Sequence, residues 1–356
     1  MFIFATLIAS SMLENRCKDN INNESGMKTD GFFFTHSDDF DLPKITGVST
    51  VADFNHRVEE RTATDVITVS EVVQARRIAA MADEVKRRGT VRVVLIAGPS
   101  SSGKTTFSKR LSVQLMAVGL KPVALSVDDY FVPRLQTPKD ENGEYDFESL
   151  YAVDLDFFNA QLQTLIGGDE VELPTYNFRT GLRENSGHRL RVEEGSVIVI
   201  EGIHALNPEL TKLIPDEQKY RIFCSVLSPV MLDGQQTIST TDNRLMRRIL
   251  RDKQYRNFSA AETIGRWPSV RQGEEKWIFP FMDTADVWFD SSFIYELAVL
   301  KEKLAPVLAE VEAHDPACDT AQRLRGYLDY FYAIPDKAVP PTSLLREFFG
   351  GSSFHY

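Results

Sequence analysis

The sequence has few cysteines, no excess of basic residues and no long hydrophobic run. Its three cysteines, Cys17, Cys224 and Cys318, are odd in number and widely spaced, which indicates neither a disulfide framework nor a zinc site. The formal net charge of −11 argues against a nucleic-acid partner, because no broad basic surface offsets the acidic excess. With 43% apolar residues the chain can bury a full core, so we expect a globular protein of the reducing cytoplasm.

The N-terminal region has no clear pattern. Phe2 to Met12 is apolar, but no basic residue precedes it and it is too short to span a bilayer, so we expect neither a secretion signal nor a membrane partner. Met27 is an alternative start. Residues 30–65 show no period, and we expect residues 1–65 to form an N-terminal extension. Thr68 to Arg88 then has the pattern of an amphipathic helix.

The most specific motif lies at residues 98–105. They read GPSSSGKT, which fits the phosphate-binding pattern G-x-x-x-x-G-K-[S/T], and they stand between an apolar run and an amphipathic stretch. This order of strand, loop and helix favours a phosphate loop over a chance match in a Gly/Ser-rich turn. The candidate nucleotide contacts are Gly98, Ser100, Ser101, Ser102, Gly103, Lys104, Thr105 and Thr106. Lys104 would reach the outer phosphates and Thr105 would hold a metal, which predicts ATP or GTP with Mg²⁺ as cofactors.

Acidic residues follow the next two apolar runs. Asp128 and Asp129 come after a run at residues 122–127, and Glu201 follows residues 197–200. Because the carboxyl ends of parallel strands form one edge of a sheet, these acids would face the phosphates. One aspartate could accept the proton of an attacking hydroxyl, and Glu201 could order Mg²⁺ or its water. The alternatives are a solvated turn for the aspartates and a structural acid that caps a turn for Glu201.

A basic helix follows further along the chain. Residues 242–252 read DNRLMRRILRD, and the arginine spacing of i, i+3, i+4 and i+7 puts most of them on one face. Such a face repels itself unless anions meet it, and phosphates during transfer are such anions. We therefore expect a mobile, arginine-rich lid that clamps phosphates. An ordinary surface helix is the alternative, although only Asp242 and Asp252 lie nearby to pair with the arginines.

The remaining patterns complete an α/β fold. Residues 171–178 and 188–192 alternate around a polar connection, which predicts a β-hairpin over the acceptor site. Two more strands are expected at residues 220–226 and 285–289, giving a P-loop NTPase fold with a five-stranded parallel sheet flanked by helices. The C-terminal helices are expected at residues 295–312 and 321–332, and residues 344–356 should pack back on the domain.

The chain resembles the uridine kinase and phosphoribulokinase group of P-loop kinases, specifically the bacterial-type uridine kinase-like nucleoside kinases. The resemblance runs from about residue 90 to the C-terminus and rests on six motifs in the family's order: GPSSSGKTT, ALSVDDYF, ENGEYDFESL, ELPTYNF, VIVIEGIHALNP and TDNRLMRRILRD. It implies Asp128 as the catalytic base and Asp146 as the acid that binds the sugar hydroxyls. It also implies pocket residues Tyr176, Phe178 and Ile203, together with lid arginines Arg244 and Arg247, the latter acting in catalysis.

Two positions depart from the family's pattern. Uridine kinases have Asp-Ser-Phe-Tyr where this chain has DDYF at residues 128–131, so the pocket tyrosine falls on Phe131 or is replaced by Tyr130. The base-reading histidine falls near Gly181, and His188 lies seven residues further on.

We therefore expect an ATP-dependent kinase for the 5′-hydroxyl of a nucleoside, uridine or cytidine. The alternatives are a kinase for a sugar phosphate or pantothenate, and a non-catalytic nucleotide-binding regulatory protein. Asp128 argues against the last, because a switch needs no base for an acceptor hydroxyl. The kinase domain is expected at residues 66–356, with a leading helix and C-terminal helices. The threonyl-tRNA-synthetase-like module that members of the family often carry is expected to be missing or vestigial in residues 1–65. The expected partner is a small molecule, and the sequence does not decide between a monomer and a homo-oligomer.

Overall fold

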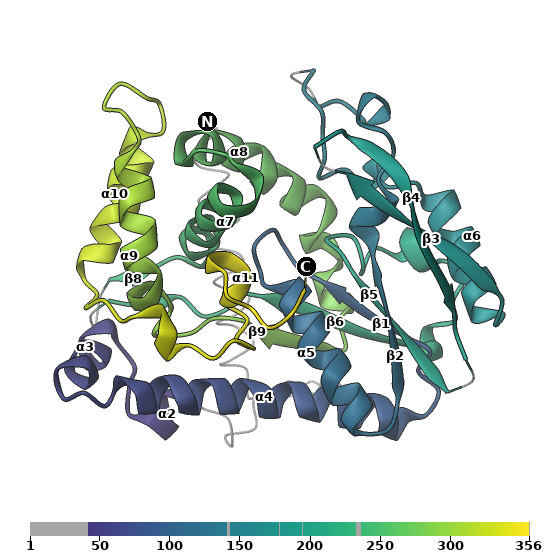
Figure 1. Ribbon diagram of the computed structural model, residues 1–356, viewed down its shortest axis with the longest axis horizontal. Helices are drawn as coiled ribbons and strands as arrows, with labels where there is room; N and C mark the ends of the chain where they lie inside the picture. The colour runs from purple at the N-terminus through teal and green to yellow at the C-terminus, as the bar shows by residue number, and fades with distance from the viewer. Residues whose placement is uncertain (1–41, 141–142, 178, 194, 233–235, 356) are drawn as a thin grey trace, which may run out of the picture. The chain divides into compact units, whose positions relative to one another are not determined.

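Five parallel strands form the central sheet (Figure 1). The computed structural model describes residues 42–355 except 141–142, 178, 194 and 233–235. The strand order is β2–β5–β1–β6–β9, and the strands are β1 (Val93–Ala97), β2 (Lys121–Ser126), β5 (Ser196–Glu201), β6 (Lys219–Ser225) and β9 (Val287–Asp290). The predicted α/β fold is confirmed, and the strand ends differ from the expected ones by one or two residues.

The register of the sheet aligns the ends of three strands. Glu201, the last residue of β5, pairs with Ser126 at the end of β2 and with Ile96 near the end of β1. The phosphate loop leaves β1 one residue later, and the two aspartates follow β2 directly. The sheet therefore brings the loop and the acidic residues to the same carboxyl edge.

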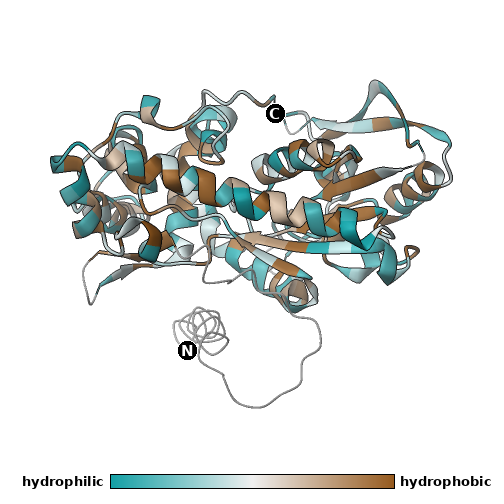
Figure 2. Cartoon of the chain, turned by 90° about the horizontal axis from the view of Figure 1, so that it is seen from below, coloured by the Kyte–Doolittle hydropathy of each residue, from teal (hydrophilic) through white to brown (hydrophobic). Residues whose placement is uncertain are grey.

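Helices cover the sheet and extend away from it. They are α2 (Leu42–Thr46), α3 (Val51–Glu59), α4 (Ala63–Arg88), α5 (Lys104–Ala117), α6 (Leu155–Ile166), α7 (Thr240–Arg256), α8 (Ala260–Trp277), α9 (Glu296–Ala309), α10 (Cys318–Asp329) and α11 (Arg346–Phe349). Figure 2 shows hydrophobic strands between helices that carry both hydrophobic and hydrophilic residues. One large apolar cluster joins the sheet to α3, α4, α5 and the helices from α7 to α11. Among the helices of the described ranges, none has the length and apolar character needed to cross a bilayer.

The leading helix is longer than the sequence predicts. It begins at Ala63 instead of Thr68, because buried Ala63, Val66 and Ile67 extend its apolar face. Part of the predicted N-terminal extension also packs on the core. A capping box between Thr50 and Asp53 starts α3 and turns buried apolar residues of that helix inwards. The domain boundary at residue 65 itself stays a prediction.

The predicted hairpin consists of β3 (Glu170–Asn177) and β4 (Leu182–Arg191), which pair antiparallel. A second, short pair joins β7 (Val230–Met231) to β8 (Thr237–Ile238). The first hairpin contacts the 3₁₀ turn η2 (Val127–Tyr130), which follows β2 and carries both aspartates. The C-terminal segment packs back as expected, with Leu344 and Leu345 fully buried.

Candidate active site at the carboxyl edge of the sheet

The phosphate loop has a conformation that its residue types explain. A Cβ at Gly98 would lie 1.9 Å from the carbonyl oxygen of Cys224, so only glycine lets the loop pass β6 this closely. Gly103 has φ +87°, and Ser101 also adopts a positive φ of 58°. Lys104 Nζ donates to the carbonyl oxygen of Pro99 at 3.2 Å and thus folds over the loop. The loop and the first turn of α5 together present backbone N–H groups of the kind that bind phosphates.

The first acid, Glu201, lies against the start of α5. Thr105 Oγ1 donates to Glu201 Oε1 at 3.3 Å, and Ser126 Oγ donates to the same oxygen at 3.5 Å. Burial, followed by the negative charge of Asp128, raises the pKa of Glu201 to about 7. A carboxylate and a hydroxyl beside a phosphate loop are hard oxygen ligands, and Mg²⁺ uses one or two carboxylates together with substrate phosphates. Thr105 and Glu201 therefore fit the predicted metal site.

Larger acidic or histidine clusters are absent from the part of the chain that the structure describes: no three His, Cys, Asp or Glu side chains gather there as metal ligands. Cys224 and Cys318 are free and buried, and Cys17 lies outside the described residues.

The two adjacent aspartates have different surroundings. Asp129 Oδ1 accepts hydrogen bonds from Tyr176 N at 3.2 Å and from Thr175 Oγ1 at 3.4 Å, so it ties η2 to the hairpin. Burial raises the pKa of Asp129, as does the charge of Asp128 to a smaller extent. The charge of Asp128 also acts on Glu201 and on Glu148, which puts it among the groups around the loop.

The 3₁₀ turn decides which aromatic side chain faces the site. In such a turn side chains three residues apart share a face. Val127 and Tyr130 are both buried, and the Tyr130 hydroxyl donates to Gln161 of α6 at 2.8 Å. The Tyr130 ring therefore packs on Phe157 and Phe158 of α6, and its role as a pocket residue stays a prediction. Phe131 instead lies edge to face with Tyr176, with ring centroids 5.5 Å apart.

The structure gives few contacts for the other residues predicted to bind the acceptor. Asp146 Oδ1 accepts from the backbone N–H of Glu148 at 3.1 Å, and the side chain keeps some exposure. Ile203, two residues after Glu201, is half-buried. Phe178 lies outside the described residues. Gly181 packs on Arg134, where a Cβ would come within 2.8 Å of the Arg134 side chain, and His188 is exposed on β4.

Two arginines of the predicted lid lie in buried ion pairs. Arg244 forms a bidentate ion pair with Glu274 of α8, at 2.5 and 2.9 Å, and Arg247 forms another with Glu296 of α9, at 2.5 and 2.6 Å. Arg247 is fully buried. Both arginines are fixed inside the structure, because acids far along the sequence neutralise them. The structure does not bring Arg247 to the phosphate loop.

A different arginine of α7 meets the loop. Arg248 Nη1 donates to Ser100 Oγ at 2.7 Å, and Arg244 Nη1 donates to the carbonyl oxygen of Ser100 at 3.1 Å. Glu274 Oε1 accepts from Ser100 N at 3.2 Å. All three polar groups of Ser100 are thus held by α7 and α8. Sequence reasoning gave no role to Arg248 or Glu274. Arg248 is nevertheless one of the four regularly spaced arginines of the basic helix.

Several buried polar atoms around the loop make no hydrogen bond within the described residues. They are Ser101 Oγ, Ser102 Oγ, Glu148 Oε2 and both ring nitrogens of His204. Burial raises the pKa of Glu148 to about 7 and lowers that of His204 to about 4, although the backbone of Ser149 opposes the latter shift. Buried polar groups normally have partners, so a concentration of unsatisfied ones is typical of a ligand site. Both residues lie within motifs of the family resemblance, ENGEYDFESL and VIVIEGIHALNP, but sequence reasoning gave neither of them a role.

A parallel sheet that delivers a phosphate loop at the edge where its acids gather is the arrangement of a P-loop NTPase. The model of the Phosphoribulokinase / Uridine kinase family matches residues 93–295, and the chain belongs to this family. It is thus a phosphotransferase, and kinases of this family use a nucleotide.

Individual relatives agree with this assignment. The chain is 28% identical to the uridine kinase of Ureaplasma urealyticum serovar 10 over 178 residues, which cover 50% of this chain and 77% of the relative. It is 29% identical to the uridine kinase of Staphylococcus aureus strain JH9 over 196 residues, which cover 55% of this chain and 85% of the relative. A solved structure called a "Possible Uridine Kinase" from Bacillus stearothermophilus is 20% identical, covers 56% of this chain and 89% of its own, and gives a TM-score of 0.37.

Proposed function

We propose that this phosphotransferase uses ATP to phosphorylate the 5′-hydroxyl of a nucleoside, uridine or cytidine. The main support is the meeting of the phosphate loop, Glu201 and Asp128 at one edge of the sheet. The names of the relatives support the nucleoside as acceptor. The partner in this proposal is a small molecule. The acidic net charge and the three widely spaced cysteines support a cytoplasmic protein without a nucleic-acid partner, and we propose no membrane partner.

In the proposed reaction the acceptor oxygen forms a bond to the γ-phosphorus while the bond from that phosphorus to the β–γ bridging oxygen breaks. ADP leaves with the bridging oxygen, and the hydroxyl proton passes to Asp128. Lys104 neutralises the charge that builds up on the transferred group. Thr105 and Glu201 would hold Mg²⁺, which supplies further charge neutralisation when bound. Asp128 suits the role of base better than Asp129, whose carboxylate is engaged by the hairpin.

Arg248 replaces Arg247 as the arginine that we assign to the phosphates. Its guanidinium donates to Ser100 of the loop, whereas the guanidinium of Arg247 forms a buried ion pair with Glu296. Arg244 acts on the loop through Ser100 and Glu274, so it is a positioning residue instead of a direct substrate ligand. A charged group that is held beside the loop stabilises transferring phosphate without reorganisation.

The acceptor would lie between η2, the hairpin and the segment around Asp146. Asp146 would accept hydrogen bonds from the ribose hydroxyls, while Phe131, Tyr176 and Ile203 would contact the base. Gly181 leaves no side chain to read the base, and the neighbouring Arg134 fills the space where one would stand. We therefore expect weaker discrimination between bases than between sugars, and a sugar-phosphate kinase is the second candidate for the same reason.

A coupled assay of ADP release tests the proposal. The acceptors are uridine, cytidine, adenosine, deoxyuridine, a set of sugar phosphates and pantothenate, each with ATP and with GTP. We expect the highest kcat/KM for uridine or cytidine with ATP and a strong loss for deoxyuridine, because the Asp146 carboxylate would lose a hydrogen-bond partner. Turnover of sugar phosphates without turnover of any nucleoside would reject the nucleoside and favour the second candidate.

Replacement of Asp146 tests the sugar contact separately. Asp146→Ala should weaken a ribonucleoside by about 1.5–3 kcal/mol, the scale of hydrogen bonds to a charged group, and should leave ATP affinity unchanged. Exposed Glu144→Gln, in the same segment, is the control and should change neither. A variant that discriminates uridine from deoxyuridine as well as the unmodified protein would show that Asp146 does not read the sugar.

A further inference from the structure

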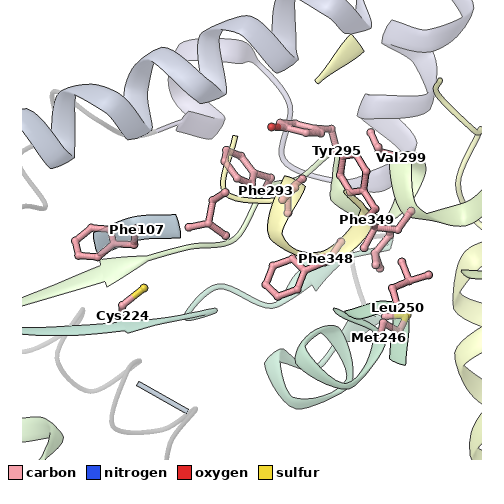
Figure 3. Close-up of a cluster of buried hydrophobic side chains, with 14 of the residues drawn as sticks. Phe107, Cys224, Met246, Leu250, Phe293, Tyr295, Val299, Phe348 and Phe349 are labelled. Atoms are coloured by element: carbon pink, nitrogen blue, oxygen red, sulfur yellow. The ribbon is translucent and has the colours of Figure 1, made fainter. Parts of the chain in front are cut away.

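The C-terminal segment, residues 343–352, lies directly on the phosphate loop. A Cβ at Gly103 would stand 2.3 Å from the Leu344 side chain, so the segment touches the loop at its second glycine. Phe348 and Phe349 anchor it, with 0% and 2% of their surface exposed. Figure 3 shows both rings within the apolar cluster that Leu250 of α7 also joins. The C-terminal segment is thus packed into the core beside the loop. Figure 1 shows its helix α11 next to α7.

This anchoring holds one carboxylate against the nucleotide loop. Glu347 Oε2 accepts from Thr106 N at 3.0 Å and from Thr106 Oγ1 at 2.8 Å. Thr106 belongs to the first turn of α5, where the helix offers N–H groups that have no acceptor within an α-helix. The first intrahelical bond of α5 runs from Phe107 N to Gly103 O at 2.9 Å, one residue after Thr106.

Those donors belong to the set that a phosphate loop offers to its ligand. The motif works because N–H groups of the loop and of the first helical turn surround the phosphates. Thr106 directly follows Lys104 and Thr105, which reach for phosphate and metal in the same motif. A polyphosphate that uses the Thr106 donors must therefore displace the Glu347 carboxylate, and the two anions also repel each other.

We propose that Glu347 is an internal competitor of the nucleotide phosphates, so that the C-terminal segment sets the affinity of the site for its nucleotide. The inference rests on the proposed nucleotide-binding function of the loop. The buried aromatic residues keep the segment in place, and the side chain of Glu347 withdraws when a polyphosphate binds. The simpler interpretation is that the carboxylate only stabilises the end of α5, where the helix dipole favours an anion.

Affinity measurements on Glu347→Gln separate these interpretations. The variant removes the charge and keeps the shape of the side chain. Competition predicts that ATP and inorganic tripolyphosphate bind about 10- to 100-fold more tightly in isothermal titration calorimetry, the range that a hydrogen bond to a charged group corresponds to. Adenosine, which has no phosphate, should bind as it does to the unmodified protein. Glu302→Gln makes the same change at an exposed position of α9 and should leave all three affinities unchanged.

An unchanged or weaker affinity of Glu347→Gln for tripolyphosphate would overturn the inference and leave Glu347 as a helix cap. If that variant does not fold, Glu347→Asp replaces it, because the shorter side chain keeps the charge but draws back from Thr106. The same rise in affinity, of smaller size, is then expected, and its absence overturns the inference. Failure of the unmodified protein and of every variant to bind ATP would overturn the nucleotide-binding function as well.

Discussion

Replacement of Glu274 tests whether α7 is a mobile lid or a fixed clamp on the phosphate loop. Glu274 is fully buried and holds Arg244 at 2.5 and 2.9 Å, Arg271 at 2.6 Å and the backbone N–H of Ser100 at 3.2 Å. Burial acts to raise the pKa of Glu274, but the charges and hydrogen bonds of the two arginines lower it. The carboxylate is therefore ionised at neutral pH, and its removal leaves the buried Arg244 without an acidic partner and Arg271 with only the more distant Glu275.

The expected loss of stability follows from this geometry. Breaking a buried ion pair by removing one partner costs about 3–5 kcal/mol, because an uncompensated charge stays inside the protein. Glu274→Gln should lower the free energy of unfolding by this amount, visible as a lower midpoint of guanidinium denaturation with an unchanged m-value. Nucleotide affinity should fall in the same variant, because Arg244 loses the acid that fixes it against the carbonyl oxygen of Ser100 and the loop is held less firmly.

The neighbouring Glu275 provides the matched control. It lies one residue further on α8, is 41% exposed and approaches Arg271 at 3.6 Å, so Glu275→Gln should change stability by less than about 1 kcal/mol. A double-mutant cycle with Arg244→Met isolates the coupling of the pair. If Glu274→Gln keeps the denaturation midpoint and lowers only kcat, the buried pair does not stabilise the fold. That result would favour the prediction of a mobile lid.

Four further substitutions probe the site. Lys104→Ala should abolish turnover in the ADP-release assay while far-UV circular dichroism stays unchanged, because the ammonium neutralises the transferred phosphate; near-normal activity would refute the phosphate-loop assignment. Asp128→Asn should lower kcat by about 10²-fold or more and Asp129→Asn by less; a larger loss at Asp129 would reverse our choice of base. The pKa of Glu148, raised from 4.5 to about 7, makes the folded protein lose stability as pH rises through this interval. Glu148→Gln should therefore gain up to about 3 kcal/mol over the unmodified protein between pH 5 and 8 in denaturation experiments, and a pH-independent difference would contradict this.

The elements that carry the phosphate chemistry were predictable because their signals are local. The motif at residues 98–105 combines a strand, two glycines with special backbone requirements and a helix start, all within a short stretch. The acids that follow β2 and β5 were found from strand topology alone, since parallel strands end at one edge. Glu201 reaches Thr105 as this reasoning requires.

The arginine helix was misjudged because its partners are distant in sequence. A search near α7 finds only Asp242 and Asp252, whereas Arg244 and Arg247 pair with acids of α8 and α9. Spacing along one helix says which side chains share a face, but not what packs against that face. The contact between Glu347 and Thr106 could not be predicted for the same reason, because its partners are 241 residues apart in the sequence.

The order of side chains after β2 shows how one turn changes the assignment of roles. The resemblance made Tyr130 a pocket candidate, because the family's tyrosine falls at Phe131 and Tyr130 stands next to it. The chain enters a 3₁₀ turn at Val127–Tyr130, in which Val127 and Tyr130 share a face, and Phe131 follows the turn. Gly202 permits this turn, because a Cβ there would lie 2.7 Å from the Val127 side chain. Asp129 then points to the hairpin, and of the two acids Asp128 keeps the side of the turn that bears on the loop.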